Sequence, residues 1–424
     1  MNTLDILYSA AGIALSPLWA RKPRSGWAER FGRTPPIPRN QVDRARVMVH
    51  AVSVGEVNAL RGLVPALARR CEVVVSASTD TGLARAKELY SAIAHVVRYP
   101  LDFSASVSRF LEAINPDAVG LVELEVWPNF IAECGRRDIP VGVINGRLSP
   151  RSFRGYRRIR RVIGPTFSRL AFAAAQDSDY AERFVAMGVP RERCTVTGSM
   201  KWDAVKIEDA VPGAEDLAVS LGIDRRRPLV VAGSTGPGEE RLFHASCSAD
   251  VQLLCAPRKP ERFDEAAEAM PGCVRRSRTR SGEAPAFGAR RFLLDTIGEL
   301  RLAYSLADVV VMGRSFGDLH GSDPVEPVAL GKPTIIGPAY GDFLSAVDAL
   351  REAGAIVVSS RESLASDIAN LLGDALRREA LAVAGRQCVH RHQGATTRHE
   401  ELLWGLVEAR RGTKPVPSGA TIAP

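Results

Sequence analysis

The sequence has no long hydrophobic run, few aromatic residues and no paired cysteines, and each shortage excludes a class of protein. Its N-terminal apolar stretch, residues 4–19, is shorter than the roughly 20 residues that a membrane-spanning helix needs. Aromatic residues make up 6% of the chain, few for a surface that stacks nucleic-acid bases. The seven cysteines form no C-x-x-C pair, so the sequence indicates neither a zinc site nor a disulfide framework and favours a reducing compartment.

Two familiar nucleotide-binding motifs are absent as well. The glycines at 233–238 do not follow the G-x-G-x-x-G spacing of dinucleotide-binding folds, and no G-K-[ST] follows them. We therefore expect neither a nicotinamide enzyme nor a nucleoside triphosphatase. Lysine and arginine number 56 against 48 aspartates and glutamates. This excess favours anionic partners, such as phospholipid headgroups, phosphorylated substrates or nucleic acid.

The order of apolar segments predicts an α/β protein of two lobes. A chain of 424 residues suits two domains of roughly 200 residues each. Short β-branched runs alternate with helical patterns, which is typical of doubly wound, Rossmann-like parallel sheets. In two such lobes, ligands bind beyond the carboxyl ends of the strands, in a central cleft. The runs are 47–52, 73–75, 118–122, 141–144, 171–175 and 195–197 and, after a polar stretch at 207–215, 229–231, 251–255, 292–294, 309–311, 334–336 and 356–358.

A carboxylate follows the first strand of the first lobe. The sequence H-A-V-S-V-G-E ends at Glu56 and leads into a helical pattern at 57–69. At a strand-to-helix turn, Glu56 is placed to accept a proton from an incoming hydroxyl. Ser53 and Glu56 also have the spacing of a capping box, in which the glutamate only bonds the backbone at the helix start. The spacing alone favours the capping box.

A second pair of carboxylates, Glu123 and Glu125, closes the strand at 118–122. Alternation along a strand sends both side chains to one side. There they would position an acceptor or pair with an arginine, and both interpretations fit the sequence.

The segment 145–161 carries seven arginines. Arginine binds phosphate through two parallel hydrogen bonds, so the segment suits a bisphosphorylated lipid or anionic headgroups. Nucleic acid and a solvated face are the alternatives, although no nucleic-acid-binding motif accompanies the arginines.

Four segments of the second lobe together predict a nucleotide site. Residues 233–240 contain glycines that let backbone amides approach a phosphate at a helix start. Residues 256–262 add cations after another strand. Thr296 and Glu299 fit either a ligand site or a capping box. A carboxylate in the first helical turn at 321–327 would hold ribose hydroxyls.

The two ends of the chain carry separate predictions. The apolar stretch 4–19 is followed by Arg21, Lys22 and Arg24, whereas a signal peptide carries its cations first, so secretion is not expected. We predict that residues 1–24 associate with the cytoplasmic leaflet of a membrane. The alternative is an amphipathic helix packed on the protein's own surface. Residues 410–424 predict a disordered tail.

Ten blocks, in this order along the chain, resemble the bacterial 3-deoxy-D-manno-octulosonic acid (Kdo) transferases, a family of GT-B glycosyltransferases. The likeness runs from about residue 30 to about residue 343. The blocks are 29–32, 50–57, 123–129, 145–158, 176–177 with 183–184, 198–203, 233–235 with 238–240, 257–258 with 261–263, 295–300, and 326–327 with 331 and 333.

The resemblance implies an inverting transferase that moves Kdo from CMP-Kdo to a lipid A precursor, with neither metal nor further cofactor. Glu56 would be the general base, with Glu123 and Lys201 stabilising the transition state. The lobe at 25–206 would bind the acceptor, and that at 207–409 the CMP sugar. The implied partners are the donor, a phosphorylated lipid acceptor and the cytoplasmic face of an anionic inner membrane, without nucleic acid. The residues that would hold CMP are Pro257, Arg258, Ile297, Gly298, Glu299, Asp323, Pro324, Val325 and Glu326.

The chain departs from the family pattern in the second lobe and at its border. The family usually has G-G-H-N-P-L-E where this chain has H-G-S-D-P-V-E at 320–326, and P-R-H where it has P-R-K at 257–259. It usually has G-N-L-K where this chain has G-S-M-K at 198–201. After Thr235, the chain has a glycine where the family commonly has a larger polar residue. The identity of the sugar acid therefore stays open. The alternatives are a GT-B transferase of another nucleotide sugar and a non-catalytic nucleotide- or lipid-binding envelope protein.

Overall fold

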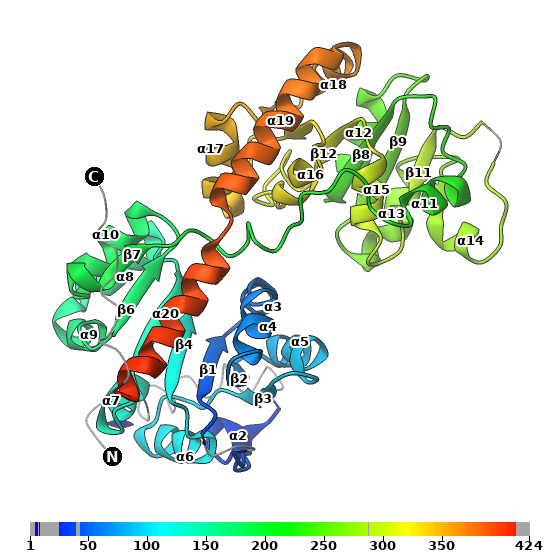
Figure 1. Cartoon of the computed structure of the whole chain (residues 1–424). Coiled ribbons are helices and arrows are strands. Elements are labelled where there is room, and N and C mark those ends of the chain that lie inside the picture. Colours follow the sequence, from blue (N-terminus) through cyan, green and yellow to red (C-terminus); the bar gives the residue numbers. More distant parts are fainter. Residues whose placement is uncertain (1–4, 7, 9–24, 40–42, 287, 413–424) are drawn as a thin grey trace. The chain divides into compact units, whose positions relative to one another are not determined.

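The computed structural model describes residues 5, 6, 8, 25–39, 43–286 and 288–412. The chain forms two compact units. The first runs to Ala204 and resumes at Gln393, and the second is Val205–His392. Each unit contains a seven-stranded sheet in which all paired strands are parallel (Figure 1). The prediction of two doubly wound parallel-sheet lobes is confirmed.

The sheet of the first unit has the strand order β3-β2-β1-β4-β5-β6-β7. Sequence analysis missed only β3, a short edge strand that is partly buried. The strands are β1 (Arg46–Ala51), β2 (Glu72–Ala77), β3 (His95–Arg98), β4 (Ala118–Val122), β5 (Val141–Gly146), β6 (Phe172–Ala175) and β7 (Cys194–Val196). The helices are α2 (Trp27–Arg30), α3 (Val54–Ala59), α4 (Leu63–Ala68), α5 (Asp80–Tyr90), α6 (Ser104–Ile114), α7 (Pro128–Arg136), α8 (Pro150–Arg158), α9 (Arg160–Phe167), α10 (Ser178–Met187), η1 (Arg191–Arg193) and α20 (Ala395–Arg410).

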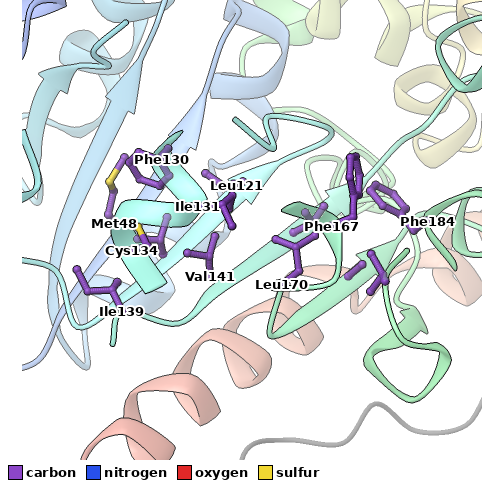
Figure 2. Close-up of a cluster of buried hydrophobic side chains, with 14 of the residues drawn as sticks. Met48, Leu121, Phe130, Ile131, Cys134, Ile139, Val141, Phe167, Leu170 and Phe184 are labelled. Carbon is purple, nitrogen blue, oxygen red and sulfur yellow. The ribbon is translucent and has the colours of Figure 1, made fainter. Parts of the chain in front are cut away.

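Alternating strand residues of the first unit build two apolar layers, one on each face of its sheet. Met48 of β1 joins a cluster with helices α6, α7, α9 and α10 (Figure 2). Its neighbours Val47 and Val49 point the other way, toward α4, α5 and α20. The sheet is therefore covered on both faces, as its continuous apolar strands predict.

Helix α20 belongs to the first unit, which corrects the assignment of residues 207–409 to the second lobe. Leu403, Leu406 and Val407 of α20 are fully or almost fully buried against β4 and β5 residues such as Val122 and Ile144. Helical periodicity shows that α20 has an apolar face, but it does not show which sheet that face covers.

The second unit repeats the arrangement with the strand order β10-β11-β9-β8-β12-β13-β14. Only the two-residue strand β10 was not predicted. The strands are β8 (Leu229–Thr235), β9 (Gln252–Pro257), β10 (Val274–Arg275), β11 (Arg291–Leu293), β12 (Val309–Met312), β13 (Thr334–Ile336) and β14 (Val357–Val358). The helices are α11 (Ala214–Leu221), α12 (Glu239–Ser246), η2 (Pro260–Arg262), α13 (Phe263–Glu268), α14 (Arg276–Arg280), α15 (Leu300–Leu306), α16 (Val325–Ala329), η3 (Gly341–Phe343), α17 (Leu344–Glu352), α18 (Leu364–Gly373) and α19 (Ala375–His392).

Each sheet has one point at which the strand order reverses. In the first unit, β2 and β4 lie on opposite sides of β1, and in the second, β9 and β12 lie on opposite sides of β8. The connections leave such a pair of strands in opposite directions, which opens a crevice at their carboxyl ends. Ligand sites are therefore expected after β1 and β4, and after β8 and β12.

The predictions for the chain ends fall mostly outside the described residues. Of the segment 1–24, only residues 5, 6 and 8 are described, and of the predicted tail only 410–412. Within the residues that the structure describes, no helix is both long enough and apolar enough to cross a membrane.

Candidate active site

Charged side chains of the first unit gather where β1 and β4 end. Glu56 follows β1, Glu123 and Glu125 follow β4, and Lys201 follows β7. Burial raises the pKa of Glu123, the charge of Glu56 raises it further, and the charges of Arg147 and Lys201 lower it. Such mutual influence requires proximity. The structure thus brings together the three residues predicted to be catalytic, Glu56, Glu123 and Lys201.

Glu56 lies in the first turn of α3, behind the N-cap Ser53. Its amide donates to Ser53 Oγ at 3.4 Å, and its carboxylate accepts from Val52 N and Ser53 Oγ, both at 2.8 Å. These are the reciprocal bonds of a capping box, except that the carboxylate reaches the residue before the N-cap. The capping interpretation is confirmed. The same bonds hold the carboxylate in one orientation at the end of β1.

Glu123 has a left-handed backbone with φ of 59°, which costs a non-glycine residue on the order of 1–3 kcal/mol. Its amide still donates to Ile144 O at 3.0 Å, so pairing with β5 continues one residue past β4 before the chain turns. Strand alternation ends at Val122 and cannot place Glu123 and Glu125 on one side, as the sequence suggested. The turn brings them together instead.

Glu125 was paired with Glu123 in the sequence analysis, but the resemblance gave it no catalytic role. Burial raises the pKa of its carboxyl to about 7, the indole of Trp127 opposes this, and the charges of Glu56 and Glu123 add to it. Trp127 Nε1 donates to Glu125 Oε2 at 2.8 Å. A carboxyl with such a pKa is placed to exchange protons near neutral pH.

The arginine-rich segment forms α8 and α9. Six of its arginines are exposed, and none of the six forms an ion pair with another described residue. Helix α8 has no buried residue. Two exposed apolar side chains neighbour these arginines in sequence, Ile159 at 50% and Val162 at 67% exposure. The six arginines are Arg151, Arg154, Arg157, Arg158, Arg160 and Arg161.

In the second unit, three of the predicted nucleotide-binding residues surround the buried Tyr304. Burial raises the pKa of Tyr304, and the charges of Glu326 and Asp323 raise it further, whereas a bond with Ser234 and the charge of Arg258 lower it. Arg258 and Asp323 are exposed, and Glu326 is partly exposed. Ser234 lies near the end of β8, Arg258 directly follows β9, and Asp323 and Glu326 follow β12, at the crevice where this sheet reverses its order.

Tyr304 itself was missed because an apolar helix position gives no functional signal. It also accounts for Gly233, since a Cβ there would overlap its ring.

The segment after β11 presents an exposed apolar side chain beside an anchored carboxylate. Ile297 is 70% exposed and Gly298 has φ of 92°. Glu299 is the N-cap of α15, so the capping-box alternative for Thr296 and Glu299, which needs Thr296 at the N-cap, is wrong. Arg276 holds Glu299 through Nη2 at 2.8 Å.

In the loop after β8, the backbone amide of Gly236 is bonded within the protein. Glu239 accepts from Gly236 N at 2.7 Å, Arg314 N at 2.6 Å and Phe316 N at 3.1 Å. The Gly236 amide is therefore not available to a phosphate, contrary to the sequence interpretation. Instead, Glu239 ties the loop after β8 to the loop after β12.

Three of the predicted CMP-binding residues, Pro257, Pro324 and Val325, are buried, so they offer a ligand little accessible surface. Among the described residues there is no group of three histidine, cysteine or carboxylate side chains arranged to hold a metal ion. All seven cysteines are free thiols.

The raised pKa of Glu125 predicts a pH-dependent cost to stability. Its pKa is about 7 in the folded protein against 4.5 ordinarily, so the folded state binds the extra proton and loses stability as pH rises through this window. We expect Glu125→Gln to raise the melting temperature more at about pH 8 than at about pH 5. Thermal denaturation checks this, with the exposed Glu112→Gln as control. An equal gain at both pH values would contradict it.

Comparison with known proteins agrees with this geometry. The family model described as 3-deoxy-D-manno-octulosonic-acid transferase (kdotransferase) matches residues 25–204. A 3-deoxy-D-manno-octulosonic acid transferase of Bordetella pertussis is 32% identical over 94% of this chain and 98% of its own length. The enzyme of the same name from Haemophilus influenzae is 30% identical over 85% and 87% of the two chains.

Solved structures show the same architecture at low identity. A glycosyltransferase of Rickettsia africae matches with a TM-score of 0.59 and 10% identity over 86% of this chain and 99% of that one. The UDP-GlcNAc 2-epimerase of Neisseria meningitidis matches with a TM-score of 0.54 and 14% identity over 85% and 99%. These establish the GT-B fold, and the sequence relatives establish that the chain belongs to the 3-deoxy-D-manno-octulosonic acid transferase family of glycosyltransferases.

Proposed function

We propose that this protein is an inverting glycosyltransferase that moves Kdo from CMP-Kdo to a phosphorylated lipid A precursor. The main support for the proposal is that Glu56, Glu123 and Lys201 lie near one another where the first sheet reverses its strand order. The relatives that share this chain's length are named as transferases of this sugar. Because Ser322 and Asp323 depart from the family pattern, a related sugar acid is the alternative donor sugar to test.

In the proposed reaction, Glu56 removes the proton from the acceptor hydroxyl. The oxygen attacks the anomeric carbon of Kdo, and the bond from that carbon to the phosphate oxygen of CMP breaks. CMP leaves with the bonding electrons and a growing negative charge. Lys201 offsets this charge, and no metal is required for the step. The bonds from Val52 N and Ser53 Oγ orient the carboxylate of Glu56 toward a fixed direction of attack.

The second unit supplies the proposed CMP site. Arg258 would bind the phosphate, Asp323 and Glu326 would bind the ribose hydroxyls, and the exposed Ile297 would pack on the base. Tyr304 lies beside Arg258, Asp323 and Glu326, and it contacts Gly233 and Ser234 near the end of β8.

The exposed arginines of α8 and α9 are the proposed binding surface for the acceptor phosphates. They belong to the same unit as Glu56 and, among the described residues, have no carboxylate partner to displace. Arginine without an internal partner is free to form bidentate bonds with phosphate.

We further propose that the first unit docks on the cytoplasmic face of an anionic membrane. Trp27 and Phe31 of the α2 region are 45% and 43% exposed. Their rings stack at 6.1 Å, and Phe31 stacks on Phe103 at 6.5 Å. Trp27 and Phe31, with Arg33 and Arg109, line a hollow of about 570 Å³. Aromatic rings beside arginines suit the interface between headgroups and acyl chains.

The N-terminal segment meets this surface. Tyr8 packs edge-on against Phe103 at 6.1 Å, and its hydroxyl donates to Asp102 at 3.2 Å. Asp5 is buried and accepts from Ser104 N at 2.9 Å. These contacts hold Asp5 and Tyr8 at Phe103 and its neighbours, where we propose that the N-terminal segment adds to membrane binding.

The first test separates capping from catalysis at Glu56. Glu56→Gln should lower turnover by about 100-fold or more, as expected for loss of a general base, and leave CMP affinity unchanged. Ser53→Ala removes the cap but keeps the carboxylate, so it should cost about 0.5–2 kcal/mol of stability with a much smaller loss of turnover. Product formation from CMP-Kdo and a lipid A precursor is measured by mass spectrometry. Equal turnover losses in the two variants would return Glu56 to capping alone.

The second test concerns the donor site. Arg258→Ala should weaken CMP binding, because it removes a charge-assisted bond to the phosphate worth roughly 1.5–3 kcal/mol. Glu326→Ala should also weaken CMP binding, because it removes the proposed bonds to the ribose hydroxyls. Calorimetric titration with CMP, UMP and UDP gives the affinities and the base preference. Arg226→Ala, at a side chain that is 91% exposed, is the control. Unchanged CMP affinity in both site variants would place the nucleotide elsewhere.

The third test concerns the membrane surface. Trp27→Ser combined with Phe31→Ser should lower retention of the protein on anionic vesicles, because membrane attachment needs apolar contact as well as charge. High salt should release much of the unchanged protein. The matched control is Ile93→Ser, since Ile93 is also 45% exposed. Full retention of the double variant on neutral vesicles in high salt would show that this surface is not the anchor.

A further inference from the structure

The segment that carries Lys201 is held by the C-terminal helix of the chain, almost 200 residues away. Lys201 lies in the stretch 197–203, which follows β7 and has no regular secondary structure. A loop of this kind does not fix a long side chain by itself. The groups that hold the loop therefore determine where the ammonium group of Lys201 lies relative to Glu56 and Glu123.

Asp203 connects the loop to the start of α20. Its two carboxylate oxygens accept from Gly394 N at 2.7 Å and from Thr396 N at 2.5 Å. Both amides lie at the N-terminus of α20, where the first amides have no partner within the helix. The N-cap residue of α20 is Gly394, which has no side chain to bond them. Asp203 therefore caps a helix whose N-cap residue, Gly394, lies 191 residues later, and its charge is favoured by the helix dipole.

Asn145 and His399 hold the other side of the loop. Asn145 Oδ1 accepts from Met200 N at 3.0 Å, directly before Lys201. Asn145 N donates to Nε2 of His399 in α20 at 2.7 Å. Because Nε2 accepts, Nδ1 carries the proton and donates to Ala395 O at 2.6 Å.

The residues at the centre of this hydrogen-bond network are buried. His399 and Asn145 are both 0% exposed, and Met200 is 1% exposed. Burial lowers the pKa of His399 to about 4, so the ring is neutral at physiological pH and keeps the acceptor that Asn145 needs. Asn145 has φ of 50°, a conformation that asparagine tolerates better than most residues.

Helix α20 is itself fixed on the sheet. Gly120 of β4 lets α20 approach, because a Cβ at that position would lie 3.0 Å from Leu403. Arg398 adds a bond from Nε to Thr197 O at 2.9 Å, and Gln393 donates to Trp202 O at 3.1 Å. The loop 197–203 is thus bound to a rigid helix at both ends.

From this geometry we propose that Asp203, Asn145 and His399 are positioning residues for Lys201, and that α20 sets the place of its ammonium group beside Glu56 and Glu123. The proposal rests on the role of Lys201 in the proposed transferase reaction. It assigns a function to the C-terminal helix beyond covering the sheet. The chain crosses between the two units at 204/205 and at 392/393. Both crossings lie next to the bond between Asp203 and Gly394.

A double-mutant cycle tests the proposal. Asp203→Ala and His399→Leu should each lower kcat by about 10- to 100-fold, as a misplacement of about 1 Å can, and leave the dissociation constant for CMP unchanged. In a Lys201→Ala background, the same substitutions should lower kcat by less than about twofold, because the group they position is gone. His399→Gln, which keeps a carbonyl acceptor near the place of Nε2, should restore most of the activity lost in His399→Leu.

The control separates positioning from packing. Leu406→Ala removes a fully buried side chain of α20 that takes no part in these bonds. It should lower the melting temperature and leave kcat close to that of the unchanged enzyme at temperatures where all variants are folded. Asp203→Asn, which keeps one acceptor, replaces Asp203→Ala in the cycle if the latter does not fold.

The outcomes distinguish the two proposals. Near-normal turnover in Lys201→Ala would overturn the catalytic role of Lys201 and with it part of the proposed function. Impaired Lys201→Ala with losses that multiply in the double variants would leave the proposed function intact and overturn the positioning role. Losses of kcat in Leu406→Ala as large as in Asp203→Ala would likewise reduce the bonds to ordinary structural support.

Discussion

The pairing of β1 with β4 is the constraint on which the first unit depends. Their register, Val47 with Ala118 through His50 with Leu121, brings the ends of two strands side by side although about 70 residues separate them in sequence. The connections then leave in opposite directions, so the turns that carry Glu56 and Glu123 face one crevice. A register shift of one residue would turn the apolar side chains of β1 to the wrong faces, so the packing of both layers also fixes the site.

This arrangement places the site residues in unfavourable backbone and electrostatic conditions. Glu123 adopts a left-handed backbone, and three carboxylates share one partly buried place, which raises the pKa of Glu123 and of Glu125 through burial first and mutual repulsion second. Arg147 and Lys201 offset part of the repulsion on Glu123. Unfavourable local choices of this kind persist where packing elsewhere supports them, and they are typical of functional sites. The capping bonds of Glu56 do not exclude its proposed role as a base, because they supply the orientation that a base requires.

Much of the fold could be predicted from the sequence, because strands buried on both faces read as β-branched runs, and twelve of the fourteen were found. The exceptions, β3 and β10, are short and lie at sheet edges, where little apolar patterning is needed. The proximity of Glu56 to Glu123 followed from strand ends and family resemblance. The surroundings of Tyr304, Glu125 and His399 did not, since each depends on burial and on contacts with residues distant in sequence. The backbone amide of Gly236 was misjudged for the same reason: its partner Glu239 is visible only in the structure.

Composition shows that positive charge is in excess, but only the structure shows which charges are available to a partner. In the second unit, Arg262 is paired with Glu240, Arg275 with Asp295, and Arg276 with Glu299, all at 2.7 or 2.8 Å. These guanidinium groups are used to hold loops, and drawing one to a ligand would leave a carboxylate unpaired. The arginines of α8 and α9 carry no such cost within the described residues. The available positive charge of α8 and α9 therefore lies in the unit that holds Glu56, the unit in which we propose that the acceptor binds.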